Sequence, residues 1–230
     1  MTARARSGRL SALVGLAAAL ALVMLGAPRL VAALVTLPSG PAIEAARAGG
    51  RVAEPHLGVA VQATRQALTW DDGAQGHADL ALLLWEQARR ADLSAPAGRS
   101  LAEATRAELD RAIALNPSHP VAWTRRTQIA LVLDGIGPRL AADLAMALRA
   151  APYDRVVLIP RLEIALIAWP LLDAGQRALV EDQIRLAALV DVDALAAIAR
   201  RRFAVGVARA ALADDPGAAL QFERAYARAS

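Results

Sequence analysis

The stretch SLAEATRAELDRAIALNPSHPVAWTRRTQIALVLDGIGPRLAADLAMALRAAP, residues 100–152, decides the fold. Ser100 and Glu103 have the spacing of a capping box, which predicts that a helix begins at Ser100. Asn116-Pro117 is a typical stop, so this helix is expected to end there. Between those limits the apolar residues recur at helical spacing, at Leu101, Ala104, Leu109, Ala112 and Leu115.

Two further helices follow in the same stretch. The second is expected over 120–134, with Gly135 as its C-terminal breaker. The third opens at Pro138 and stops before Pro152, and its apolar stripe is Leu140, Leu144, Ala147 and Leu148. A large apolar residue, an alanine and a proline therefore recur at equal spacing, first as Leu109, Ala112 and Pro117 and then as Leu144, Ala147 and Pro152.

That spacing resembles the tetratricopeptide repeat, a helix pair of about 34 residues. Trp123 falls where that repeat has an aromatic residue in its first helix, but Arg126-Thr127 replaces the small pair expected after it. The resemblance implies an all-α fold in which antiparallel helix pairs stack as a short solenoid. Further helices are expected over 57–69, 75–91, 160–169 with Pro160 in the first turn, from Asp173, from Asp191 to Arg202, over 203–213 and over 217–228.

The composition agrees with packed helices. Hydrophobic residues make up 56% of the chain but aromatic residues only 3%, so the apolar content is aliphatic and suits close helix packing better than sheets. All 26 basic residues are arginines, which indicates a GC-rich bacterial genome, and the net charge is only +4. Because part of this charge lies in the first nine residues, the body has no basic footprint for nucleic acid. The absence of cysteine excludes disulfides and thiolate metal sites.

The N-terminus predicts a membrane anchor. Three arginines, the last of them Arg9, precede an apolar run over residues 10–28, which at about 1.5 Å per residue covers about 28 Å, close to the hydrocarbon thickness of a bilayer. The positive-inside rule then places the N-terminus in the cytoplasm and everything after about residue 38 outside it, on the periplasmic side of a bacterial inner membrane. A signal peptide cleaved near Val31-Ala32-Ala33, or a buried helix, is the alternative.

This organisation predicts three parts. Residues 1–37 are a cytoplasmic stub and transmembrane anchor, 38–56 a linker or short helix, and 57–230 the helical-repeat domain. Residues 10–28 are the expected contact with the lipid bilayer.

Nothing in the sequence predicts catalysis. His56, His77 and His119 are far apart and are interpreted as surface residues, so no metal site is expected. The acidic pairs fall at helix boundaries or polar faces, where capping explains them. No nucleophile elbow or phosphate-binding glycine loop is present, so no catalytic or cofactor-binding residue is assigned. Arg200-Arg201-Arg202 lies at a helix end, where it complements the dipole.

The predicted function is that of a non-catalytic scaffold or accessory subunit that binds other envelope proteins. In a regular repeat the groove would be faced by Trp123 and the polar residues beside it, Thr124 and Gln128. The turn Pro152-Tyr153-Asp154 with Arg161-Leu162 and Trp169-Pro170 also resembles membrane proteins of bacterial envelope polysaccharide clusters, which implies a role in polysaccharide synthesis or export. A helical enzyme or enzyme subunit with an unrecognised site, and a secreted soluble binding module, remain the alternatives.

Overall fold

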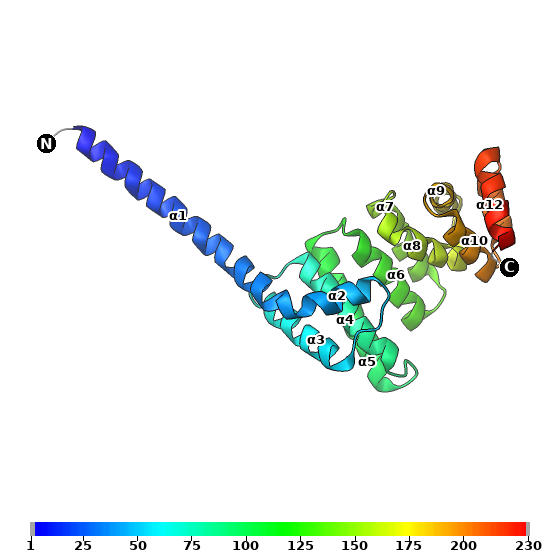
Figure 1. Cartoon of the computed structure of the whole chain (residues 1–230), viewed down its shortest axis with the longest axis horizontal. Coiled ribbons are helices and arrows are strands. Elements are labelled where there is room, and N and C mark those ends of the chain that lie inside the picture. The colour runs from blue at the N-terminus through cyan, green and yellow to red at the C-terminus, as the bar shows by residue number, and fades with distance from the viewer. Residues whose placement is uncertain (1–2, 229–230) are drawn as a thin grey trace.

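The protein is all-α, as the sequence predicted. The computed structural model describes residues 3–228, with side chains from Val14 onwards, and this part of the chain contains helices and no strands (Figure 1). From α2 to α11, each helix packs against the next one along the chain, and α12 packs against α10 and α9. The helices, with two short 3₁₀ turns labelled η, are α1 Ala3–Thr36, η1 Leu37–Ser39, α2 Gly40–Arg47, α3 Glu54–Leu68, α4 Ala74–Arg90, α5 Pro96–Leu115, α6 Pro120–Asp134, α7 Pro138–Ala150, α8 Arg155–Ala168, η2 Trp169–Leu171, α9 Ala174–Val190, α10 Val192–Arg201, α11 Val205–Ala211 and α12 Pro216–Arg228.

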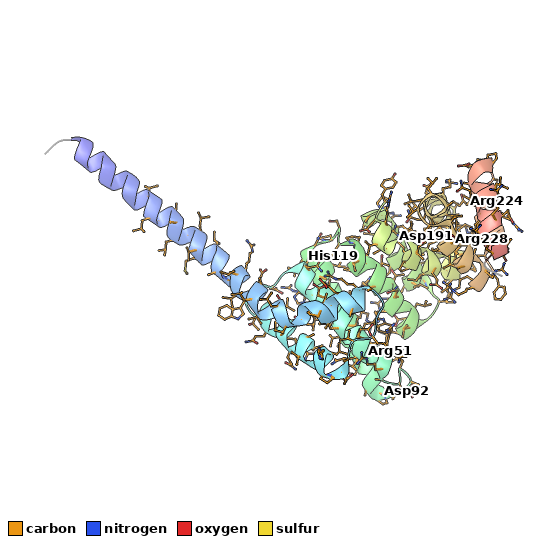
Figure 2. All side chains as sticks on the ribbon, in the orientation of Figure 1. Arg51, Asp92, His119, Asp191, Arg224 and Arg228 are labelled. Atoms are coloured by element: carbon orange, nitrogen blue, oxygen red, sulfur yellow. The ribbon has the colours of Figure 1, made fainter. Side chains whose placement is uncertain are left out.

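Helix α1 projects from the body as a rod, and its described side chains stand free for most of its length (Figures 1 and 2). Within the described residues it is the one helix long and apolar enough to cross a membrane. Leucine, valine and methionine side chains between Val14 and Leu25 are 62–71% exposed. The helix continues through Pro28 and Arg29 and packs on α3 only near its C-terminal end. Between Val14 and Leu25 the large apolar side chains of α1 therefore lack a partner among the described residues.

The segment after α1 forms a packed helix. Residues 38–56 were predicted to be a linker or a short helix, and the structure has η1 and α2 there. Ala42, Ile43 and Ala46 of α2 are buried against α3 and α4 together with Leu57 and Leu83. This packing ties the end of α1 to the body.

The predicted start of α5 is wrong. The helix begins at Pro96, one turn before Ser100, because proline at the first helical position has its φ already set and loses no hydrogen bond there. Ser100 and Glu103 lie inside the helix, where Glu103 pairs with Arg99 at 3.4 Å instead of closing a capping box.

The repeat positions are interior, as predicted. Leu109, Ala112, Leu144 and Ala147 are each 0% exposed. The ends of α6 and α7 agree with the sequence too: α6 runs from Pro120 to Asp134, α7 opens at Pro138, and Gly135 between them has the positive φ of +75° that glycine tolerates best.

The start of α8 corrects a second prediction. Pro160 was expected in the first turn, but α8 already begins at Arg155, because the Asp154 carboxylate accepts a hydrogen bond from the Val156 amide at 2.9 Å and caps the helix. Pro160 therefore lies inside α8. Since proline has no N–H, the carbonyl of Val156 lacks its helical donor.

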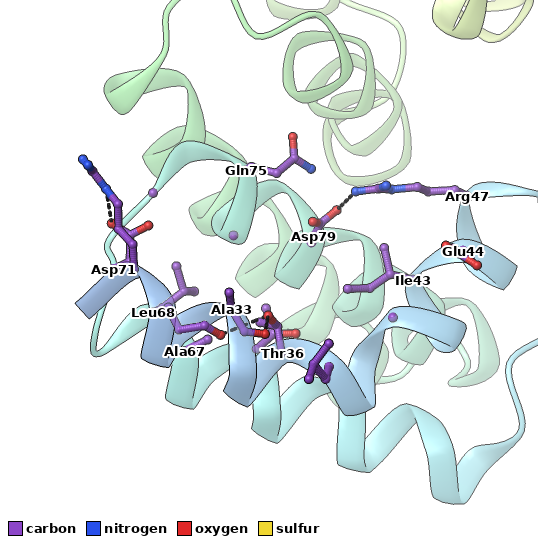
Figure 3. A pocket seen from close by; sticks show the side chains of 17 residues that line it. Ala33, Thr36, Ile43, Glu44, Arg47, Ala67, Leu68, Asp71, Gln75 and Asp79 are labelled. Atoms are coloured by element: carbon purple, nitrogen blue, oxygen red, sulfur yellow. Dashed lines mark hydrogen bonds and ion pairs between the residues drawn. The ribbon is translucent and has the colours of Figure 1, made fainter. Parts of the chain in front are cut away.

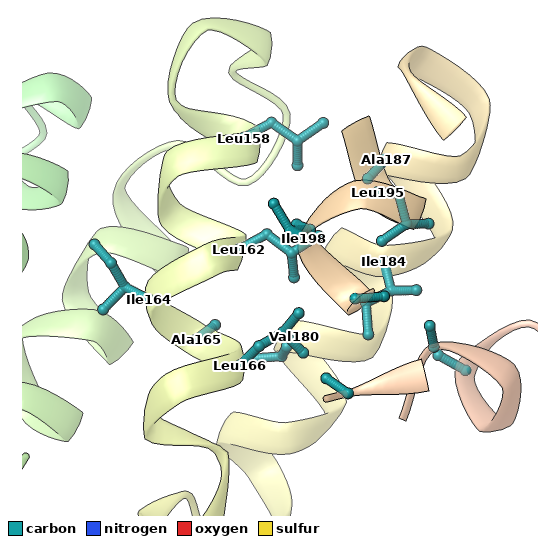
Figure 4. Packing of buried hydrophobic residues seen from close by; sticks show 14 of the residues in the cluster. Leu158, Leu162, Ile164, Ala165, Leu166, Val180, Ile184, Ala187, Leu195 and Ile198 are labelled. Carbon is teal, nitrogen blue, oxygen red and sulfur yellow. The ribbon is translucent and has the colours of Figure 1, made fainter. Parts of the chain in front are cut away.

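The C-terminal half shares one aliphatic core, to which α8, α9 and α10 contribute the residues labelled in Figure 4. Arg161 lies within this core at 0% exposure. Its guanidinium donates to the carbonyls of Ala147 and Ala151, both at 2.9 Å, and to the side-chain oxygen of Gln183. The Gln183 amide in turn donates to the Pro152 carbonyl at 2.7 Å. Arg161 therefore caps the C-terminal end of α7 and joins it to α8 and α9.

Candidate functional site

A pocket of about 250 Å³ lies where α4, α6 and α8 meet the end of α2. These three helices are alternate members of the chain, so the pocket lies on the face made by the first helices of successive pairs. We call it the arginine pocket. It is lined by Ala46, Arg47, Gly49, Leu82, Trp85, Glu86, Arg89, Val121, Thr124, Arg125, Gln128, Val156, Val157 and Pro160.

The charges of the arginine pocket do not balance. Arg47 is paired with Asp79 at 2.6 Å, and Arg89 is paired at 3.0 Å with Glu86, whose side chain is almost completely buried. Arg125 makes no hydrogen bond or ion pair with any residue in the described part of the chain. Of the three guanidinium groups in the lining, that of Arg125 is therefore the one that no carboxylate in the described residues contacts directly.

The surroundings of Arg125 remove much of its water. Burial lowers the pKa of its guanidinium to about 10, and the charge of Asp79 counteracts that effect only in part. The group remains charged at neutral pH. A partly desolvated cation without a partner gains most from an anion, and the planar guanidinium matches a carboxylate with two parallel hydrogen bonds.

Uncharged residues add to the polar lining of the pocket. Gln128 lies one helical turn from Arg125 on α6, and within the described residues its amide has no hydrogen-bond partner. Val156, whose carbonyl Pro160 leaves without a helical donor, is one of the α8 residues that line the pocket. Trp85, Leu82 and Val157 supply apolar surface between these groups. The pocket can therefore accept a carboxylate, an amide and an apolar side chain together.

The three residues predicted to face the groove do not all line the pocket. Thr124 and Gln128 line the pocket, although the Thr124 hydroxyl already donates to the Pro120 carbonyl at 3.0 Å. Trp123 does not line it: its indole N–H donates to the Pro117 carbonyl at 2.8 Å, and its ring lies 5.4 Å from the Arg126 guanidinium carbon. The aromatic wall comes from Trp85 on α4. Arg125 was not singled out, because in sequence it is one of many arginines on helices.

Arg126, the departure from the repeat pattern, acts within the fold. It lies between α5 and α7 and pairs with Asp110 at 2.6 Å and with Asp143. Burial raises the pKa of the Asp143 carboxyl, while the charge of Arg126 opposes that shift.

A larger cavity of about 490 Å³ lies between the end of α1 and α2, α3 and α4 (Figure 3). We call it the α1 cavity. Its walls are mainly small or aliphatic, with Ala33, Ala67 and Leu68 among them. Two ion pairs stand at its edges, Arg29–Asp71 at 3.9 Å and Arg47–Asp79 at 2.6 Å. Arg47 lines both cavities, so α2 separates them.

The remaining candidates have structural roles. His119 is 7% exposed, so the interpretation of it as a surface residue is wrong; its Nδ1 accepts from the Ala122 amide at 3.3 Å and caps α6 (Figure 2). His77 contacts Asp72 and Glu108. No group of three or more histidines, cysteines or acids in the described residues is placed to hold a metal ion. Arg200 stacks on Tyr226 at 4.3 Å, and Arg201 and Arg202 pair with Glu163.

Comparison with protein-family models, with curated proteins and with solved structures finds no match. The resemblance to tetratricopeptide repeats and to envelope polysaccharide proteins stays a prediction from the sequence.

Proposed function

We propose that the protein is a membrane-anchored, non-catalytic scaffold that binds acidic segments of other envelope proteins in the arginine pocket. The observation that carries the proposal is Arg125, a partly buried guanidinium that has no hydrogen-bond or ion-pair partner among the described residues and lies in a pocket with apolar walls. The anchor is α1, and the positive-inside rule puts the body on the periplasmic side of the inner membrane.

The size of the pocket favours a peptide over a small molecule. Sites for small ligands usually measure about 300–1,000 Å³, and the arginine pocket, at about 250 Å³, falls below that range. It has room for an acidic side chain or a chain end with a neighbouring apolar residue. Trp85 and Arg125 are of the residue types that dominate binding energy at protein interfaces. We therefore assign the pocket to the anchoring residue of a longer segment that continues over the helix face.

Binding of paired peptides tests this function. The full chain in detergent micelles is titrated into fluorescent peptides that contain glutamate, and into the same peptides with glutamine, while anisotropy is measured. Because a hydrogen bond to a charged group contributes about 1.5–3 kcal/mol, Arg125→Gln should weaken binding of the glutamate peptides by about 10- to 150-fold. Arg149→Gln, on the exposed face of α7, is the matched control and should bind like the wild type.

Equal binding of glutamate and glutamine peptides would refute the proposed chemistry. Equal losses in Arg125→Gln and Arg149→Gln would show a general charge effect without use of the pocket. Added salt should weaken wild-type binding less than it weakens a surface contact, since partly buried pairs are screened less.

A further inference from the structure

The α3–α4 turn lies beside the point where α1 would leave a bilayer, an inference that rests on the proposed membrane anchor. Arg29 is the first charged residue after Arg9, so it marks the end of the apolar run. Its guanidinium lies 3.9 Å from the carboxylate of Asp71, which belongs to the turn between α3 and α4. Figure 3 shows this contact at the edge of the α1 cavity. The residues 69–73 therefore lie at the height of the membrane boundary.

The length of the apolar surface agrees with this height. From Leu10 to Leu37 the chain rises about 42 Å at about 1.5 Å per residue, so the apolar residues continue beyond the hydrocarbon core of about 30 Å on the side of the body. Leu30, Leu34 and Leu37 are 57–67% exposed and follow one another at helical spacing. The end of α1 thus keeps an apolar face into the headgroup layer, while Ala32 packs towards the body.

Trp70 occupies the exposed position of this turn. Its side chain is 51% exposed, and within the described residues its indole N–H has no hydrogen-bond partner. Trp85 and Trp169 pack on apolar clusters, and Trp123 is hydrogen-bonded. Backbone hydrogen bonds stabilise the turn, because the amides of Trp70 and Asp71 both donate to the Ala67 carbonyl, at 2.9 and 3.0 Å. A fixed, exposed indole suits a membrane interface, where its apolar ring and polar N–H are both satisfied.

We propose that the α3–α4 turn, residues 69–73, rests in the headgroup layer of the leaflet on the side of the body, with Trp70 as its anchor. We favour a lipid surface over a protein partner because Trp70 is the neighbour of Asp71, which lies 3.9 Å from Arg29 at the end of the apolar run of α1. Two attachments, α1 and the turn, fix the orientation of the body relative to the bilayer. The arginine pocket, between α4 and α8, is then held at a constant distance from the membrane.

Spin labels measure this contact directly, because the chain has no cysteine of its own. Thr69→Cys places a nitroxide in the turn and keeps Trp70. Leu20→Cys, in the apolar run, and Leu189→Cys, 78% exposed on α9, are the bilayer and water controls. Figure 1 shows α9 on the part of the body away from α1. The full chain is placed in vesicles of equal parts phosphatidylcholine and phosphatidylglycerol, and power saturation gives accessibility to oxygen and to a nickel chelate.

The ratio of oxygen to nickel accessibility at position 69 should lie several-fold above that at 189 and below that at 20. Adding Trp70→Ser should lower it towards the value at 189. If the ratio at position 69 equals the ratio at 189 while the ratio at 20 indicates lipid, the membrane anchor is supported and the docking of the turn is wrong. If 20 itself reports water, the proposed anchor fails. Protection of 69 from both reagents would show that protein covers the turn, and an unchanged ratio in Trp70→Ser would refute the role of the indole.

Discussion

Replacing Arg161 with methionine should destabilise the C-terminal half of the body. Methionine fills much of the same volume, so the change removes the hydrogen bonds and leaves little empty space. Arg161 is 0% exposed and donates to three acceptors, the carbonyls of Ala147 and Ala151 and the side-chain oxygen of Gln183. The Ala147 carbonyl is in the last turn of α7, where helical carbonyls lack backbone donors.

The magnitude follows from these acceptors and from the cost of burying the cation. A buried acceptor that loses its partner costs about 1–3 kcal/mol, so three of them would cost about 3–9 kcal/mol. Part of this loss is offset because the variant no longer buries a charged group. Burial lowers the pKa of the Arg161 guanidinium to about 10, and its Nε has no hydrogen-bond partner in the described structure. We expect a net loss of about 2–5 kcal/mol for Arg161→Met. All three acceptors belong to other residues, so they remain in the variant and lose their donor.

Urea unfolding of the full chain in detergent micelles, followed by circular dichroism, measures the effect. A loss of this size should lower the urea midpoint by about 1–2 M. Arg161→Lys keeps the charge but offers one nitrogen in place of the guanidinium fork, so its midpoint should lie between those of the wild type and Arg161→Met. Arg149→Met, exposed on α7, should stay within about 0.5 kcal/mol of the wild type. A midpoint for Arg161→Met equal to or above that of the wild type would refute the capping role.

Three further predictions test other parts of the chain. Leu144→Ala should cost about 2–5 kcal/mol of stability because it leaves a cavity at a fully buried position. The same urea titration compares it with Arg149→Ala, and an equal effect of the two variants would mean that the helix faces are misassigned. Burial lowers the pKa of His119 below its usual 6.5, so the stability that neutral His119 contributes is present above about pH 6.5 and is lost as the pH falls, by at most about 1.4 kcal/mol per pH unit. His119→Asn keeps a capping side chain and should reduce this loss when unfolding is measured from pH 7 to pH 5. An unchanged dependence of stability on pH would exclude His119 as its source. Leu20→Arg should release the chain from the membrane fraction on alkaline extraction, since an arginine at the centre of a span costs about 2.5–3.5 kcal/mol, and full retention would argue against a span through residues 10–28.

Local patterns in the sequence were sufficient to predict most of the helices, but not every helix start. The interior positions Leu109 and Leu144, the breaker Gly135 and the helix start at Asp173 each follow from residues within one or two turns, and the structure has each of them. The two wrong helix starts have the same cause. At Ser100 and at Pro160 a recognised local signal lies inside a helix that another signal, Pro96 or Asp154, begins earlier.

The candidate site required the tertiary structure. Thr124 and Gln128 could be placed on the groove from the periodicity of α6 alone, but Trp85, Arg125 and Val156 come together from three different helices. Whether a helical arginine is paired depends on residues far away in sequence: Arg126 finds Asp110 and Asp143, whereas its neighbour Arg125 finds no partner in the described residues. The turn that carries Trp70 lies beside α1 for the same reason, since only the fold brings Asp71 within 3.9 Å of Arg29. Sequence periodicity determines which face of a helix is buried, and the packing of helices decides which polar groups on the other faces meet.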